Sequence, residues 1–392
     1  MVDTNADGIG DADADTNNDN EIQVSEAEAV TNLHIDHFII SSLTGIEAFV
    51  NLDYLDCSFN NLSFLDLSQN TLLEVLDCAQ NNISTLNVTQ CTLLELLFCS
   101  GNDLFSLDVT QNPNLIALSC VSNLLPSLDI SQNQNLEYLN CRGNDIEELD
   151  LSQNSIITEI DCGSNLLTNL DLSQNVALTN LNANFNFLES INITNCSNLN
   201  FLFLYENELN TLDVSQNQNL FILVCYGNNL TSLDVSQNSG LEVIYCANNQ
   251  LEALNIQNGN NQNMTSVSTG GNPNLNCIQV DDVTYANSQL CVDPISEGWC
   301  KDPWTNYSED CGFLGVDDTT FSIGVYPNPT KKFINITSDE ELISIEVYTF
   351  SGMLIESFND TKVIDISGYS DGNYILKINT DKGYKIKKII KA

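Results

Sequence analysis

Residues 52–70 read LDYLDCSFNNLSFLDLSQN, and the chain repeats this pattern at one fixed interval. The repeats begin, without a gap, at Leu52, Leu73, Leu94, Leu115, Leu136, Ile157, Leu178, Leu199, Leu220 and Leu241. Their shared pattern is LxxLxCxxNxLxxLDLSxN, which contains the half-pattern LxxLxxxxN twice. One unit cannot bury its apolar residues alone, so successive units are expected to stack as coils that align Leu on Leu. The two half-patterns predict two short strands in each coil.

Asparagine occupies the ninth position of every unit. These residues are Asn60, Asn81, Asn102, Asn123, Asn144, Asn165, Asn186, Asn207, Asn228 and Asn249. An amide carries two donors and an acceptor, so it can satisfy backbone groups at a tight bend. We therefore predict a structural ladder of hydrogen bonds.

These repeats resemble the leucine-rich-repeat family, in its 21-residue bacterial form. The resemblance covers roughly residues 30 to 290. It implies a mainly β, right-handed solenoid with a parallel sheet on its concave face.

Charge is distributed unevenly along the chain. The formal net charge is −42, and nine of the eleven basic residues lie between Lys331 and Lys391. The part of the chain before Lys331 is therefore strongly acidic and repels phosphate backbones and anionic membranes, which excludes nucleic acid as a partner.

The sequence has no apolar run of about 18 residues, so no transmembrane segment is predicted. It also starts without a signal peptide, and since export is predicted below, we expect that the native start has been trimmed.

The cysteines fall into two groups. Most occupy the sixth repeat position, where Ala183 and Leu204 replace cysteine in two units, so this position favours a buried apolar group. Cβ atoms on in-register strands lie about 4.8 Å apart, farther than a disulfide allows, which predicts reduced thiols. Cys91 and Cys196 replace asparagine at a second repeat position, and we expect them to be free too. The remaining four cysteines are predicted to form disulfides in a C-terminal cap. We favour the pairs Cys277–Cys311 and Cys291–Cys300, with the other pairings open.

The acidic N-terminus resembles the calcium loop of an EF-hand. Its predicted ligands are Asp15, Asn17, Asp19, the carbonyl of Glu21, and Glu26 at the twelfth loop position. Asn20 stands where such loops usually carry glycine, and asparagine tolerates the left-handed conformation. A weaker, shorter candidate precedes this loop, with Asp3, Asn5, Asp7 and Asp11 as its ligands. We expect bound Ca²⁺ to be structural and to order the entry into the first coil. The alternative is a solvated acidic tail.

Beyond Cys311 the repeats stop and the apolar period falls to two. Alternating runs predict strands at about residues 333–337, 343–347, 353–358, 363–366, 374–379 and 384–390. Their layout predicts a small antiparallel β-sandwich.

Four motifs of this region resemble a known sorting domain. YPNP at 326–329, YTFSG at 348–352, DISGYSDGNY at 365–374 and KKIIK at 387–391 are similar to the domain recognised by the type IX secretion system of Bacteroidetes. The resemblance covers residues 321–392. It implies that the secretion machinery is a partner of this domain, and that the protein is released or attached to the outer-membrane surface.

The sequence argues against an enzyme. His34 and His37 are the only histidines, and no phosphate loop, nucleophile elbow or HExxH motif occurs. A partner is instead expected on the sheet, where the third, fifth and seventh positions of each unit point outward. The predicted binding residues are Phe201, Phe203, Tyr205, Tyr226 and Tyr245, with Tyr138 and Arg142 nearer the centre. The alternative is that the C-terminal cap folds over this patch.

The sequence thus predicts a secreted or cell-surface binding protein that recognises a protein or glycan. The alternative is a calcium-stabilised surface or matrix component without a discrete ligand. The predicted segments are an acidic calcium-binding stretch (1–28), a cap turn (29–51), ten repeats (52–262), a disulfide-bonded cap (263–313), a linker (314–320) and the sorting domain (321–392).

Overall fold

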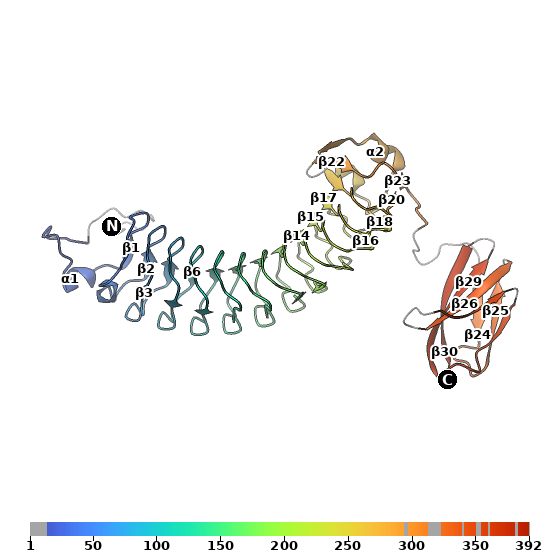
Figure 1. Ribbon diagram of the computed structural model, residues 1–392, viewed down its shortest axis with the longest axis horizontal. Coiled ribbons are helices and arrows are strands. Elements are labelled where there is room, and N and C mark those ends of the chain that lie inside the picture. Colours follow the sequence, from blue (N-terminus) through green and yellow to red (C-terminus); the bar gives the residue numbers. More distant parts are fainter. Residues whose placement is uncertain are drawn as a thin grey trace. The chain divides into compact units, whose positions relative to one another are not determined.

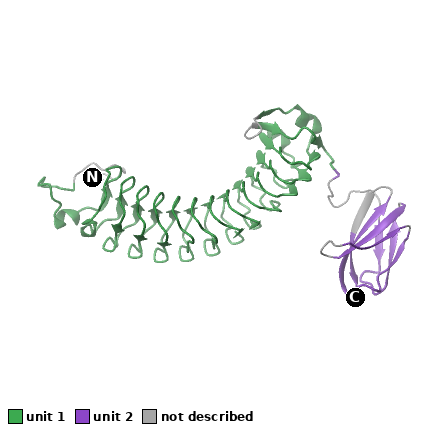
Figure 2. Ribbon diagram, viewed as in Figure 1, with its two compact units in different colours: residues 1–311 green, residues 312–392 purple. Residues whose placement is uncertain are grey.

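The computed structural model describes residues 14–293, 297–312, 323–338, 341–349, 354–359, 361–380 and 383–391. The chain forms two compact units, Met1–Cys311 and Gly312–Ala392 (Figure 2). Unit 1 is a curved stack of coils, and unit 2 consists of antiparallel strands (Figure 1). This confirms the predicted fold class, a solenoid followed by a small antiparallel unit.

One sheet of 14 strands runs through unit 1, and each coil of the stack adds one strand to it. Consecutive strands pair in parallel and in register, so that Leu55 lies opposite Leu76, while the last pair, β22 and β21, is antiparallel. In spatial order the strands are β1 (Asn32–His34), β2 (Tyr54–Asp56), β4 (Val75–Asp77), β6 (Leu96–Phe98), β8 (Ala117–Ser119), β9 (Tyr138–Asn140), β10 (Glu159–Asp161), β12 (Asn180–Asn182), β14 (Phe201–Phe203), β15 (Ile222–Val224), β17 (Val243–Tyr245), β19 (Ser266–Ser268), β22 (Glu297–Cys300) and β21 (Cys291–Asp293).

The second half of the repeat forms strands of two or three residues in seven of the ten units, not in each coil as predicted; the units that begin at Leu115, Leu136 and Leu199 have no such strand. They pair in parallel into three small sheets. Their members are β3 (Leu65–Asp66), β5 (Leu86–Asn87) and β7 (Leu107–Asp108); β11 (Asn169–Asp171) and β13 (Ser190–Asn192); and β16 (Ser232–Asp234), β18 (Ala253–Asn255), β20 (Cys277–Gln279) and β23 (Asn306–Ser308).

Repeated side chains fill the interior of the stack. The first and fourth repeat positions, such as Leu52 and Leu55, are completely buried. The ten cysteines predicted to be free are free and buried. Each ninth-position amide bonds two coils: Asn165 Nδ2 donates to the carbonyls of Cys141 and Cys162, both at 3.1 Å, and Asn165 Oδ1 accepts from Ile146 N at 3.1 Å. The predicted asparagine ladder is thus a row of side-chain bonds to buried backbone groups.

Short elements close the two ends of the stack. At the N-terminal end they are α1 (Val24–Ala27) and the 3₁₀ turn η1 (Ile46–Ala48), and at the C-terminal end η2 (Asn261–Asn263) and α2 (Val283–Ser288). Trp299 on β22 is buried, and its Nε1 donates to Met264 O at 3.1 Å. Disulfides join Cys277 to Cys311 and Cys291 to Cys300, which is the nested pairing favoured above.

Unit 2 contains two antiparallel sheets around one apolar core. The first sheet is β24 (Ile323–Tyr326), β25 (Phe333–Ser338) and β28 (Val363–Asp365); the second is β27 (Leu354–Asn359), β26 (Leu342–Thr349), β29 (Gly372–Thr380) and β30 (Gly383–Lys391). Ile334 and Ile364 of the first sheet share a buried cluster with Val347 and Leu376 of the second. Within the described ranges, none of the helices has the length and apolarity that crossing a bilayer requires.

Candidate functional site

The outer face of the 14-stranded sheet, called the sheet face here, is built by the strand alternation. In β14 the middle residue, Leu202, is completely buried, whereas Phe201 and Phe203 on either side are half-buried. Register places Phe201 beside Ile222, Phe203 beside Val224, and Val224 beside Tyr245. The stacking of coils thus gathers side chains of successive repeats on one face.

Aromatic residues gather on and beside this face, and they are together called the aromatic surface here. Tyr205 and Tyr226 stack with ring centroids 4.8 Å apart, and Phe185 meets Tyr205 edge to face at 5.3 Å. Phe221 contacts Phe201 in the same edge-to-face way at 6.0 Å. The members of the aromatic surface are Phe185, Phe201, Phe203, Tyr205, Phe221, Tyr226 and Tyr245. Partial burial raises the pKa of Tyr226, and the neighbouring Tyr205 and Glu206 add to this shift.

The C-terminal cap extends the sheet beside β17 through β19 and β22. Phe203, Tyr205, Tyr226 and Tyr245 remain half-exposed, and Phe185 is 49% exposed. The predicted binding residues therefore lie together on an accessible surface, and the alternative of a covering cap is not what the described residues show.

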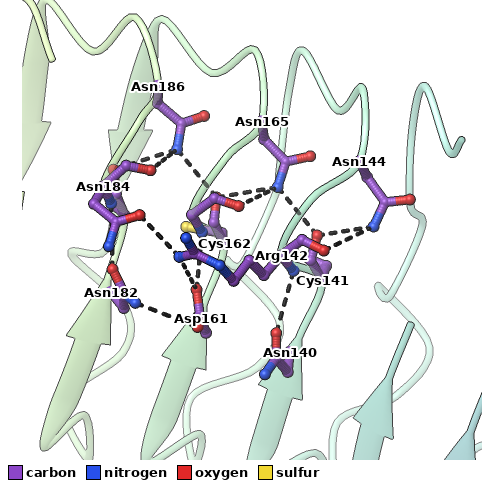
Figure 3. Close-up of polar contacts among 12 residues, drawn as sticks. Asn140, Cys141, Arg142, Asn144, Asp161, Cys162, Asn165, Asn182, Asn184 and Asn186 are labelled. Atoms are coloured by element: carbon purple, nitrogen blue, oxygen red, sulfur yellow. Dashed lines mark hydrogen bonds and ion pairs between the residues drawn. The ribbon is translucent and has the colours of Figure 1, made fainter. Parts of the chain in front are cut away.

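A polar cluster adjoins the aromatic surface (Figure 3). Arg142 Nη1 donates to Asn184 Oδ1 at 2.9 Å and lies 3.8 Å from Asp161 Oδ1. Asn182 Nδ2 donates to the other oxygen of Asp161 at 3.3 Å. Gly163 makes room for the guanidinium, because a Cβ atom there would stand 2.5 Å from Arg142 Nη1. Arg142 is thus held flat across one coil.

Polar and aromatic groups meet in a shallow hollow of about 360 Å³. It is lined by Glu159, Ile160, Asp161, Asn180, Leu181, Asn182, Phe201 and Phe203. A second hollow, of about 550 Å³, shares Phe201 and adds Phe221. The binding site predicted from the sequence did not include Glu159 and Asp161, although both residues occupy outward repeat positions. Tyr138 also lies on the sheet face, where its hydroxyl accepts from Asn140 Nδ2 at 3.2 Å.

The predicted calcium loop is compact in the described part. Asn18 and Asn20 have positive φ, 60° and 71°, which allows the loop to fold back on itself. Gln23 Nε2 lies 2.9 Å from Asp19 Oδ2 and 3.2 Å from Glu21 O, so two predicted ligands converge on one point.

Glu26 closes this loop by hydrogen bonds to its own backbone. It is 8% exposed and accepts from Thr16 N at 2.8 Å and Gln23 N at 3.0 Å. Glu26 also accepts a hydrogen bond from the Thr16 hydroxyl, and this bond is the main reason why the pKa of Glu26 is lowered. The weaker candidate, Asp3 to Asp11, lies outside the described residues.

In unit 2 the two ends of the predicted sorting region are bonded to each other. Asn328 Nδ2 donates to Lys388 O, and Asn328 Oδ1 accepts from Ile390 N, both at 2.8 Å. Lys391 Nζ reaches Asp371 Oδ1 at 3.1 Å. The YPNP, SDG and lysine-rich motifs thus belong to one folded assembly.

Residues 324–392 match the family of secretion system C-terminal sorting domains. The sorting domain indicates that the protein is secreted or attached at the outer-membrane surface. Among curated protein sequences, none matches this chain.

Solved structures share the fold of unit 1. The functional domain of InlJ from Listeria monocytogenes, which includes a cysteine ladder, is 22% identical, with a TM-score of 0.59 over 94% of this chain and 92% of that one. The leucine-rich-repeat protein LIC12759 of Leptospira interrogans is 22% identical, with a TM-score of 0.56 over 67% and 77%. An internalin of Listeria monocytogenes, InlF, is 18% identical, with a TM-score of 0.53 over 73% and 90%. At these identities the likeness shows a leucine-rich-repeat solenoid fold alone.

Proposed function

We propose that this protein is an exported surface protein that binds a partner, a protein or a glycan, through the sheet face between β10 and β17. The aromatic surface carries this proposal. Aromatic side chains bury much apolar area at little entropic cost, and they dominate the energetics of many interfaces. Here they are half-exposed on a regular scaffold, so they are ordered before a partner arrives.

The hollow beside the aromatic surface adds polar recognition. Glu159 and Asp161 supply acceptors, and Asn180 and Asn182 supply amide donors and acceptors. The net charge of −42 disfavours an anionic partner. His34 lies on β1, at the other end of the sheet from this hollow.

The test compares the full chain with a double variant, Tyr205→Ser/Tyr226→Ser. Both proteins are screened on a glycan array and against a displayed peptide library, and each ligand found is measured by calorimetry. We expect the variant to lose at least about tenfold in affinity, because an aromatic anchor contributes about 2 kcal/mol or more.

A matched control is Phe64→Ser/Phe105→Ser, which removes two aromatic side chains that are each 63% exposed and lie outside the aromatic surface. This control should bind like the unmodified chain. Equal binding by all three proteins, or equal loss in both variants, contradicts the proposed site.

We further propose that Asp15, Asn17, Asp19, Glu21 and Glu26 bind Ca²⁺ and so order the N-terminal end of the solenoid. Carboxylate, amide and carbonyl oxygens at these loop positions are the donors that Ca²⁺ prefers. Support comes from the convergence of Asp19 and Glu21 O on Gln23 Nε2, and from the positive φ of Asn20 at the sixth position. Glu26 connects the loop to α1, whose residue Ala27 is buried in the solenoid core.

Calcium titration of the full chain checks this proposal. Ca²⁺ should raise the melting temperature, and Glu26→Gln should weaken binding at least about tenfold, because the glutamate supplies two of the ligand oxygens. Glu28→Gln is the control, since Glu28 is exposed and lies just beyond Glu26 along the chain. If the melting temperature does not change with calcium, or if both variants lose calcium affinity equally, the N-terminal segment is only a solvated acidic tail.

A further inference from the structure

Three metal-binding side chains converge at the N-terminal end of the sheet face. His34 on β1 lies directly opposite Asp56 on β2 in the parallel register. Asp36 lies in the turn that follows β1. One ligand atom from each of His34, Asp36 and Asp56 lies within 4.8 Å of the other two. This cluster is separate from the calcium loop, whose predicted ligands end at Glu26.

Neighbouring groups hold these ligands in place. Asp56 Oδ1 accepts from Ser58 N at 2.9 Å and from the Ser58 hydroxyl at 2.7 Å, which fixes the direction of the Asp56 carboxylate. Asp36 Oδ2 lies 2.8 Å from His37 Nδ1. His34 is 7% exposed, and its ring packs on Tyr54 with a centroid distance of 4.7 Å. Such second contacts fix the direction of a ligand and strengthen metal binding.

We propose that His34, Asp36 and Asp56 bind a divalent first-row transition metal, with Zn²⁺ as the best fit. Zn²⁺ combines imidazole nitrogen with carboxylate oxygen and accepts three protein ligands with one further position open. Two carboxylates also balance its double charge. Ca²⁺ takes six to eight oxygen ligands, so this mixed set of three disfavours it.

The bound cation joins the cap strand β1 to the first repeat strand β2. Within the cluster His34 is buried, whereas Asp36 and Asp56 are half-buried. The inference stands independently of the proposed aromatic binding site and of the calcium loop.

The test is a Zn²⁺ titration of the full chain by calorimetry, with Ca²⁺ present in excess to saturate oxygen-only sites. We expect one Zn²⁺ per chain and a higher melting temperature. Asp56→Asn keeps the acceptor that Ser58 uses but replaces the second oxygen, so binding should weaken by at least about tenfold. Asp36→Asn should weaken Zn²⁺ binding as well. Because Asp36 is partly exposed, this variant is expected to fold.

Asp66→Asn is the matched control. Asp66 Oδ1 accepts from Ser68 N at 3.0 Å, the same local bond that Asp56 makes with Ser58, but Asp66 lies on the separate strand β3. This variant, and Glu26→Gln in the calcium loop, should bind Zn²⁺ as the unmodified chain does. No stoichiometric Zn²⁺ binding, unchanged binding in Asp36→Asn and Asp56→Asn, or equal loss in Asp66→Asn would each overturn the proposal.

Discussion

Single asparagine side chains close each coil onto the coil before it. Asn165 is 4% exposed and satisfies two backbone carbonyls of its own coil, together with one carbonyl and one N–H of the preceding coil. In a second row the asparagine amides act as donors: Asn154 Nδ2 donates to Ile130 O and Asn133 O, while the buried Asn154 Oδ1 accepts no hydrogen bond from the described residues. Where Cys196 replaces asparagine in that row, its thiol donates to Leu172 O at 3.4 Å. A side chain at these positions is therefore selected for its donors.

Replacement of Asn165 by alanine tests this role. Asn165→Ala leaves buried backbone groups without their partners, and each such group costs about 1–3 kcal/mol. We expect the free energy of unfolding, measured by urea denaturation, to fall by about 3 kcal/mol.

Asn135→Ala serves as the control, because Asn135 is exposed and makes one bond, to Pro113 O at 3.1 Å. It should change the free energy of unfolding by less than about 0.5 kcal/mol. A similar small change in Asn165→Ala would show that the ladder is dispensable.

At the scale of the elements, the row of free thiols behind the main sheet behaves as an apolar strip. Burial raises the pKa of Cys120 and Cys162 to about 12, against an ordinary value of 9.0. Asp161 adds to the shift at Cys162. These thiols therefore stay protonated in the folded protein at pH values at which the unfolded chain would lose their protons.

The sign of the pH dependence follows from this difference. A raised pKa in the folded state favours folding below the unfolded pKa, and the advantage is lost as the pH rises above 9. At pH 10.5 each such thiol should lower the free energy of unfolding by up to about 2 kcal/mol. Urea denaturation under reducing conditions at pH 8 and pH 10.5 measures the loss.

A Cys141→Ala/Cys162→Ala variant provides the comparison, since Ala183 occupies the same repeat position naturally and is completely buried. Its stability should fall less between the two pH values. An identical fall in both proteins would assign the alkaline sensitivity to other groups.

The regular elements could be predicted from sequence because each depends on a spacing. The constant period of the repeat fixes which leucines, cysteines and asparagines are neighbours, and alternation fixes which strand residues point outward. Where the period breaks, that inference ends. The spacing from His34 to Asp56 differs from the repeat period, so the repeat pattern does not predict that these two residues lie opposite each other.

The candidate binding site was predictable only in part. Its aromatic members stand out as large apolar side chains at outward positions. Glu159 and Asp161 resemble the many other acids in a chain whose net charge is −42, and the contact of Asp161 with Arg142 depends on the space that Gly163 leaves for the guanidinium.

At the scale of the whole molecule, the two units have different roles. Unit 1 supplies a long acidic scaffold that carries the proposed binding surface, and the sorting domain, which holds most of the basic residues, indicates export. The asymmetry of charge follows the boundary between the units. Because each unit has its own apolar core, changes to the sheet face need not disturb the export signal.

The parallel register of the solenoid has one last consequence. Since every junction between coils joins equivalent residues, such as Leu139 to Ile160 and Leu181 to Leu202, gene duplication or loss of whole repeat units recreates a junction of the same kind. Such a molecule can lengthen or shorten its reach in fixed increments during evolution. An insertion of any other size would displace every later side chain from its row.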